Sequence, residues 1–481
     1  MTKGKTIVSR EKSLVKNTAI LAIGQLSSKI FTFLLLPVYT SMLTTEDFGT
    51  IDALLTIINL VLYFVTLQIE NAVFRFVIEN RNNIKSQFSY IAGGLVVMLL
   101  MSLLATVIAI IIGKIWTIPY IGFLVLALWA QSGYLFVSNL ARGLGNNVDY
   151  SIASFFVTVS SLVINIVLIV GLGHGASSVL VALICSNIIG MMYLFLKLRF
   201  WKLIRLRAFD RRKTKEMLNY SLPLIPNAIS WWIANSSDRL LIIYFLGTSF
   251  NGIYAAANKI PAIYNTIFSV FNTAWTESVS LSINDEDRNE YINSMINRGF
   301  KLFAFLNMSI IICVSIFFKW LIGSNYVQSY NHIFILLIAI FVNSMCSLYG
   351  GVLSGLKNTK VIGWTTVVGS VVNAVINIMF IRYIGLYAAS ISTLIAYIVI
   401  YIFRIIKLKK EISIKLERNF LLQCCLTLLI VSIGYFYKNI GLNIVIFCFL
   451  IIWGSYHNKS IILPMWYKIK KSVIYFINCN N

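Results

Sequence analysis

Fourteen long apolar runs constrain the fold of this chain more than any other feature of its sequence. A membrane-spanning helix needs about 20 apolar residues, and only short polar breaks separate the runs. Hydrophobic residues make up 58% of the chain and charged residues only 12%, a balance that excludes a soluble domain. We therefore expect an all-α integral membrane protein with about 14 transmembrane helices, at roughly 17–40, 48–70, 88–112, 118–140, 150–172, 176–198, 218–246, 251–278, 298–318, 330–354, 361–381, 385–405, 420–437 and 441–457.

Lysine and arginine are distributed very unevenly between the loops. With a cytoplasmic N-terminus, 33 of the 40 cations fall in cytoplasmic loops and tails, three lie within spans, and the four in outer loops are Lys114, Lys319, Arg382 and Lys438. Because positively charged loops stay on the cytoplasmic side of a membrane, both termini are predicted to be cytoplasmic. The anionic inner leaflet then accounts for the net charge of +23, and no nucleic-acid partner is expected.

Part of the sequence is repeated. Residues 141–178 and 353–390 align without a gap and share 12 identities in 38 positions. The offset of 212 residues makes the repeating unit six helices, and an even number gives both copies the same direction in the membrane, as in parallel-repeat transporters. We expect two six-helix pseudo-repeat lobes around a central cavity, plus two C-terminal helices. The predicted parts are an N-terminal lobe (1–200), a basic cytoplasmic connector (201–217), a C-terminal lobe (218–406), helices 13 and 14 (419–457) and a basic cytoplasmic tail (458–481).

Ionisable side chains inside spans are candidate site residues, because each costs at least about 2.5–3.5 kcal/mol to insert. The first span carries Lys29 near its middle, with Gln25 one turn away. This face is expected to line a cavity. The alternative is that the Lys29 ammonium reaches the membrane surface along its own side chain.

The seventh span combines polar residues with prolines. Asn235 and Asp238 share one helical face, and Arg239 lies beside Asp238. Pro223 and Pro226 are expected to break the hydrogen-bond ladder of the cytoplasmic half and make this span a gate or hinge. Pairing of Asp238 and Arg239 with other buried charges, as a purely structural device, is an equal alternative to a role in ligand binding.

The eighth span repeats this pattern with Asn258 and Asn265, and Lys259 flanks the polar stripe. If Lys259 faces the same cavity as Lys29 and Arg239, that cavity carries excess positive charge. Arginine together with lysine is the combination expected for phosphate. The sequence therefore predicts a cationic cavity that binds an anionic substrate.

A further charged pair lies at the cytoplasmic end of the second span. Glu70 and Arg75 are placed where a substrate from the cytoplasm would enter. An ordinary interfacial ion pair is the favoured alternative for these two residues. They are kept as candidates for a cytoplasmic entrance.

No pattern in the chain indicates a cofactor. The seven cysteines form no CxxC pair and the three histidines are dispersed, so neither a disulfide nor a metal site is expected. A phosphate-binding GxxxxGK[ST] loop is also missing from the sequence, which argues against direct ATP hydrolysis. Coupling to a proton or sodium gradient is one expectation, and the sequence leaves protons, sodium and the membrane potential open as alternatives.

Several segments resemble one known family. They are VYTSMLTTEDFGTIDAL after the first span, NAVFRF at the end of the second, SSDRLLIIYFLGTSFNGIYAAANKI across the seventh and eighth, and GLKNTK between the tenth and eleventh. Over essentially its whole length the chain resembles the bacterial polysaccharide repeat-unit (O-antigen) flippases of the multidrug/oligosaccharidyl-lipid/polysaccharide exporter superfamily. The segment SSDRLL…GIYAAA is the most specific of the four.

The resemblance implies a transporter of the bacterial inner membrane. Its substrate would be an undecaprenyl-pyrophosphate-linked oligosaccharide, moved from the cytoplasmic to the periplasmic face, and its partners would include anionic lipid and other polysaccharide-assembly proteins. A multidrug/cation antiporter of the same superfamily is the nearest alternative. Such pumps typically have twelve helices, whereas this chain is expected to have about fourteen. A membrane polysaccharide polymerase or ligase is a third, but it would require a large periplasmic loop.

Overall fold

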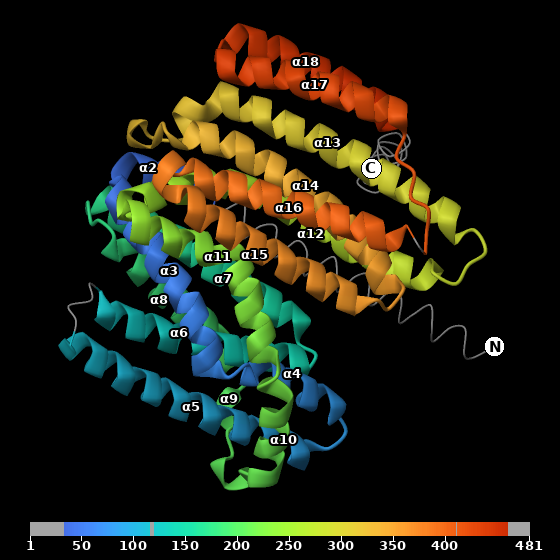
Figure 1. The fold of residues 1–481 in the computed structure, drawn as a ribbon. Helices are drawn as coiled ribbons and strands as arrows, with labels where there is room; N and C mark the ends of the chain where they lie inside the picture. Colours follow the sequence, from blue (N-terminus) through green and yellow to red (C-terminus); the bar gives the residue numbers. More distant parts are fainter. Residues whose placement is uncertain (1–32, 116–119, 410, 460–481) are drawn as a thin grey trace, which may run out of the picture. The chain divides into compact units, whose positions relative to one another are not determined.

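The computed structural model describes residues 33–115, 120–409 and 411–459, and in these ranges every regular element is a helix (Figure 1). Eleven of the described helices are long and apolar enough to cross a membrane. The expectation of an all-α membrane protein is confirmed. The eleven are α3 (Thr45–Thr66), α5 (Ile84–Ile115), α6 (Ile121–Gly143), α7 (Asn147–Ile166) with its π-helical extension η1 (Val167–Gly171), α8 (Ser177–Lys197), α13 (Arg288–Leu321), α14 (Ser329–Gly355), α15 (Thr359–Ile384), α16 (Tyr387–Leu408), α17 (Arg418–Tyr437) and α18 (Ile440–His457).

Two more of the expected spans are helical but less apolar. They are α11 (Leu224–Leu246) and α12 (Thr248–Ser282), in which charged and amide side chains interrupt the hydrophobic sequence. The first expected span lies mostly outside the described residues, and α2 (Leu36–Met42) covers its end. Each of the other thirteen expected runs thus corresponds to a helix in the described part of the chain.

The second expected run, 48–70, is not one helix. Helix α3 ends at Thr66, and the next two residues, Leu67 and Gln68, have left-handed φ angles of 49° and 56°. Non-glycine residues rarely adopt this conformation, and the Thr66 hydroxyl supports it by accepting a hydrogen bond from the Gln68 N–H at 3.1 Å. The chain then starts α4 (Ile69–Glu79), so Glu70 lies outside the spanning helix.

The basic connector between α8 and α11 is folded. It forms α9 (Phe200–Leu203), the 3₁₀ turn η2 (Leu206–Ala208) and α10 (Arg211–Ser221), and α10 packs against α4 and α5. Asp210 caps α10 by accepting from the Arg212 N–H at 2.8 Å. The Tyr90 hydroxyl of α5 donates to Glu216 at 3.0 Å. These contacts fix the connector to the first half of the chain.

The described helices form two compact units. Unit 1 comprises residues 1–259 together with 381–386, and unit 2 comprises residues 260–380 and 387–481. The division falls inside α12, so the first turns of this helix belong to unit 1 and the rest to unit 2. The two six-helix lobes inferred from the repeat stay a prediction.

In unit 1 the starts of α3 and α12 touch through their backbones. A Cβ atom on Gly49 would overlap the Thr248 carbonyl oxygen, and one on Gly252 would overlap the Thr45 carbonyl oxygen. The Asn251 amide adds a hydrogen bond to the Gly49 carbonyl at 2.8 Å. Small residues of this kind let membrane helices approach closely, because lipid supplies no hydrophobic force between them.

In unit 2 the last two helices, α17 and α18, pack on α13 (Figure 1). Two tyrosines join this group to α14. The Tyr330 hydroxyl donates to the Tyr435 carbonyl at 2.7 Å, the Tyr435 hydroxyl donates to the Tyr330 carbonyl at 2.6 Å, and the two rings stack with centroids 4.1 Å apart. Helices α17 and α18 are therefore an integral part of unit 2.

The segment that precedes α17 is also held in place. Asn293 donates to the Ser413 carbonyl at 2.9 Å and accepts from the Lys415 N–H at 2.6 Å. One turn later, Asn297 makes the same two kinds of bond to Lys415 and Glu417. The two asparagine side chains of α13 therefore bond to the backbone N–H and C=O groups of this segment, as a neighbouring strand would.

The topology can be tested with two single cysteines in a cysteine-free background. Lys215→Cys on α10 is expected to react with a membrane-impermeant maleimide only after the cells are permeabilised, because the connector is predicted to be cytoplasmic. Lys438→Cys, between α17 and α18, is expected to react in intact cells. Labelling of Lys215→Cys in intact cells would overturn the topology.

Candidate functional site

Two of the charged residues predicted for the site, Arg239 and Lys259, lie against α3. Arg239 of α11 forms an ion pair with Asp52 of α3, with 2.8 Å between Nε and Oδ2. The N–H does not point well enough at the carboxylate for a hydrogen bond, so the contact is mainly Coulombic. Only 24% of the Arg239 side chain and 12% of the Asp52 side chain are exposed. In this poorly solvated setting each charge depends on the other.

Asp238 faces a different neighbour. Adjacent residues on a helix point about 100° apart, so Asp238 turns from α3 towards α12. There the Tyr254 hydroxyl donates to its Oδ2 atom at 3.2 Å, and Asp238 is buried. The two adjacent charges of α11 thus connect this helix to two different helices of unit 1.

Lys259 lies one turn of α3 away from the ion pair. Its Nζ atom is 5.9 Å from the ring centroid of Phe48, which precedes Asp52 by four residues. A cation over an aromatic face is attracted by the ring quadrupole. Two of the predicted cations, Arg239 and Lys259, therefore lie against successive turns of α3.

The sequence analysis missed Asp52. It belongs to an apolar run, GTIDALLTII, and a single acid within such a run was the available signal. With Asp52 and Asp238 opposing Arg239 and Lys259, the described residues of this cluster carry equal numbers of acids and cations. Excess positive charge at the site would now have to come from Lys29. Both Lys29 and Gln25 lie outside the described residues.

Two of the three predicted asparagines make local bonds. The Asn235 amide donates to the Trp231 carbonyl at 2.7 Å and is exposed, and the Asn258 amide donates to the Tyr254 carbonyl at 2.9 Å. Asn265 is exposed and belongs to unit 2. Asn258 is thus the asparagine next to the charged cluster of unit 1.

The predicted entrance residues do not pair with each other. Arg75 is exposed, bonds to Glu79 at 2.9 Å and lies 5.0 Å from the centroid of the Tyr220 ring. Glu70 is buried, with 6% of its surface exposed. The two residues are therefore in different surroundings, and the alternative of a Glu70–Arg75 ion pair is wrong.

A further cation, at the end of the expected span 385–405, is buried inside unit 2. Arg404 of α16 has only 6% of its surface exposed. It donates to the Cys346 carbonyl at 2.6 Å and to the hydroxyls of Thr365 and Thr366, each at 3.3 Å. All three acceptors are neutral, so Arg404 contributes a net positive charge among α14, α15 and α16.

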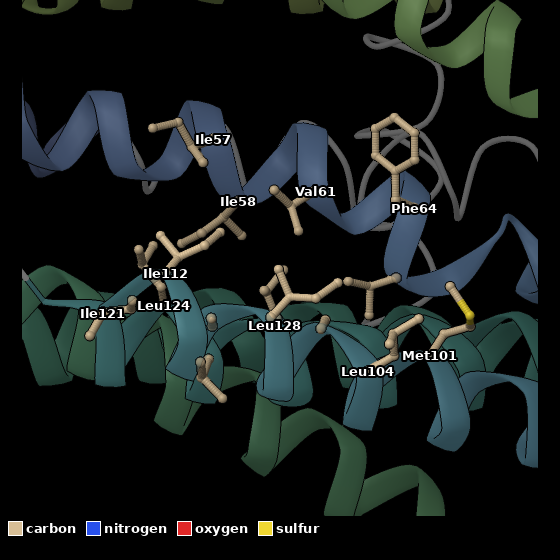
Figure 2. Close-up of a pocket in the computed structure, with 15 residues that line it drawn as sticks. Ile57, Ile58, Val61, Phe64, Met101, Leu104, Ile112, Ile121, Leu124 and Leu128 are labelled. Atoms are coloured by element: carbon tan, nitrogen blue, oxygen red, sulfur yellow. The ribbon is translucent and has the colours of Figure 1, made fainter. Parts of the chain in front are cut away.

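An apolar crevice of about 260 Å³ lies between α3, α5 and α6 of unit 1 (Figure 2). Ile58 and Val61 of α3 project towards Leu104, Leu124 and Leu128 on the opposite side. All of its lining residues are aliphatic, aromatic or methionine. Such a lining offers no hydrogen-bonding side chain, so it suits a hydrocarbon chain.

The two prolines of the seventh span mark the start of a helix. Pro223 is the N-cap of α11 and Pro226 is in its first turn. Backbone N–H groups of a first turn have no intrahelical acceptor, so neither proline removes a bond from within α11. The expected break inside a helix is corrected to a junction between α10 and α11, while the gating role is still a prediction.

The double change Pro223→Ala and Pro226→Ala is expected to fuse α10 and α11. Two restored N–H groups can then bond to carbonyls one turn earlier. If this junction is the gate, transport slows several-fold while substrate binding is unchanged. Parallel measurements of binding and transport rate in reconstituted vesicles test this, and an unchanged rate would remove the junction from the mechanism.

Comparison with known proteins places this architecture in a family. Residues 14–276, which include Asp52, Arg239 and Lys259, match the family described as "Polysaccharide biosynthesis protein". The chain belongs to the polysaccharide biosynthesis protein family. A relative in Methanocaldococcus jannaschii, the uncharacterized membrane protein MJ1375, is 22% identical over 83% of this chain and 100% of its own length.

Two solved structures have a fold similar to that of this family member. The inward closed conformation of the lipid II flippase MurJ has a TM-score of 0.66 and is 12% identical, covering 92% of this chain and 99% of its own. An inward-facing multidrug resistance MATE family transporter of the MOP superfamily has a TM-score of 0.65 and is 14% identical, covering 82% of this chain and 100% of its own. The family member thus shares the fold of both proteins, as the sequence resemblance predicted.

Proposed function

We propose that this protein is a flippase that moves undecaprenyl-pyrophosphate-linked oligosaccharide from the cytoplasmic to the outer face of the bacterial inner membrane by alternating access. Membership of the polysaccharide biosynthesis protein family is the observation that carries this proposal. The matched residues include the charged cluster on α3. Similarity of fold to the lipid II flippase MurJ supports a lipid-linked substrate.

Arg239 is the group proposed to receive the pyrophosphate. A guanidinium binds phosphate oxygens in a bidentate manner, with stronger bonds than a neutral donor makes. The Asp52–Arg239 contact holds Arg239 in place without a well-aligned hydrogen bond. The diphosphate therefore competes with a single carboxylate, and Lys259 and Lys29 supply further positive charge.

The polyprenyl chain is proposed to stay in hydrocarbon throughout. Moving a sugar headgroup across the bilayer is costly because its hydroxyls lose water, whereas the lipid tail needs no such protection. The apolar crevice between α3, α5 and α6 provides a surface of matching chemistry in unit 1. A proton or sodium gradient is the proposed driving force, and the anionic inner leaflet interacts with the basic connector.

A deletion strain and reconstituted vesicles together test this function. Loss of the gene is expected to cause accumulation of lipid-linked saccharide on the cytoplasmic face. The purified protein is expected to move the same lipid across a vesicle bilayer. Drug sensitivity without accumulation would indicate a multidrug antiporter, and accumulation of unpolymerised saccharide on the outer face would indicate a polymerase or ligase.

A further inference from the structure

Unit 1 contains a second, polar cavity of about 580 Å³. It lies where the end of α3 and the start of α4 meet α6 and α7, away from the ion pair on α3. Only Leu135 and Val157 of its lining residues lack a hydrogen-bonding side chain. Its volume is within the range of about 300–1,000 Å³ that is typical of small-molecule sites.

Glu70 lines this cavity and carries a buried oxygen that is unpaired among the described residues. Its Oε1 atom accepts from the Asn71 amide at 3.4 Å, while Oε2 has no hydrogen-bond partner among the described residues. Glu70 is 6% exposed and lies outside the spanning helices, and burial raises the pKa of its carboxyl above the usual value. An unsatisfied buried carboxyl is costly. Protein atoms cover Oε2, so a ligand hydroxyl would bond to the carboxyl after the Glu70 side chain turns towards the cavity, and this bond would relieve the cost.

Arg142 provides the opposite charge in the same cavity. Its guanidinium lies 4.7 Å from the centroid of the Phe74 ring and 5.3 Å from that of Tyr150, and it donates to Asn139 at 3.4 Å. In the described part of the chain it forms no salt bridge. The aromatic rings therefore hold the guanidinium in position, and no carboxylate among the described residues pairs with its charge.

Aromatic side chains alternate with these polar groups. Tyr63, Tyr134 and Tyr150 all line the cavity. The Tyr134 hydroxyl shares a hydrogen bond with Ser154 at 3.1 Å, which fixes its ring. A sugar ring has apolar C–H faces that pack on aromatic rings and a rim of hydroxyls that needs paired donors and acceptors.

We propose that this cavity binds a saccharide of the lipid-linked substrate, an inference that rests on the proposed function. A carboxyl, a guanidinium and several amides would form hydrogen bonds with the sugar hydroxyls, and the tyrosine rings would pack on the C–H faces of the sugar. The opposed charges of Glu70 and Arg142 disfavour a doubly charged diphosphate here and favour a neutral polyol.

Binding of two lipids to the purified protein in nanodiscs tests the proposal. One probe is the polyprenyl-linked saccharide fraction extracted from cells that carry the gene, and the other is undecaprenyl pyrophosphate without sugar. Wild-type protein is expected to prefer the saccharide-carrying lipid. Glu70→Ala and Tyr134→Phe are each expected to weaken that preference about tenfold, the effect of one lost hydrogen bond of typical strength, and to leave binding of the sugar-free lipid unchanged.

Glu79→Ala, on the same helix but exposed, is the matched control and should behave like wild type. Tyr134→Phe removes only a hydroxyl, so it keeps the test decisive if Glu70→Ala folds poorly. If the variants lost the same affinity for both lipids, the cavity would be an anion site and the proposal would be overturned. Variants that kept the wild-type preference for the saccharide-carrying lipid would overturn it as well. If the variants kept the wild-type lipid preference and transported lipid-linked saccharide, the proposed function would stand and only the role of this cavity would be refuted. If the wild-type protein preferred the saccharide-carrying lipid but did not transport it, the proposed function alone would be refuted.

Discussion

Arg239→Gln is expected to abolish transport and to lower the amount of folded protein. The change leaves Asp52 largely buried without a countercharge, and removing one member of a buried ion pair typically costs about 3–5 kcal/mol. The proposed diphosphate contact is lost as well. Surface polysaccharide in a complemented deletion strain, normalised to protein by quantitative immunoblot, measures both effects.

The double change Asp52→Asn and Arg239→Gln separates the two roles of Arg239. Removing both charges abolishes the unpaired carboxylate, so protein levels are expected to recover while transport does not. Lys85→Gln, which removes an exposed cation of unit 1 with no proposed role in the site, is the control and should transport normally. A double variant with wild-type transport would mean that Arg239 is only a structural partner of Asp52.

Lys29→Ala is expected to resemble Arg239→Gln in transport but not in protein level. With two acids and two cations in the described cluster, Lys29 is the residue that would make the cavity cationic. Lys259→Ala is expected to have a smaller effect, because Lys259 is predicted to lie closer to the outer interface, where water can substitute for its ammonium group. Wild-type transport by well-expressed Lys29→Ala would refute the cationic cavity.

Gly252→Leu is expected to cause a large loss of folded protein, the second large effect that we predict. Even a Cβ atom at this position would overlap the Thr45 carbonyl, so the starts of α3 and α12 would have to separate. That separation would also break the bond from Asn251 to the Gly49 carbonyl and shift Asp52 relative to Arg239. We expect most of the protein to be lost from the membrane fraction, as measured by fluorescence size-exclusion chromatography.

Gly122→Leu is the matched control for this change. Gly122 is also a glycine of a spanning helix of unit 1, but among the described residues no atom outside its own helical segment lies within 4 Å of a Cβ placed there. Its elution profile should match that of wild type. If Gly252→Leu behaved in the same way, the close contact of the two helices would not be needed for folding.

The sequence predicts the helices of this protein well because bilayer thickness sets their length. It predicts interruptions less well. Nothing in the residue types of Leu67 and Gln68 indicates a left-handed break, since the conformation is imposed by the surrounding packing. For the same reason the sequence places Glu70 at the end of a span, whereas it lies in α4 and borders a cavity of unit 1. Its role at an entrance is still a prediction.

Partners in the site were harder to predict than the site residues. Arg239 and Asp238 stand out because charges in a span are rare. Their neighbours come from α3 and α12, and a single sequence carries no record of which helices meet. Asp52, 187 residues before Arg239, could be suspected from its apolar surroundings but could not be paired. The prolines of α11 were recognised, but their effect depended on where the helix begins.

Arg404 restricts how unit 2 can move. Its guanidinium bonds to a carbonyl of α14 and to two hydroxyls of α15 while its backbone belongs to α16. Sliding any of these helices by one turn, about 5.4 Å, would strand a buried charge with no acceptor. These bonds oppose a ratchet between the three helices, so we expect the parts of α14, α15 and α16 around Arg404 to move together in a transport cycle.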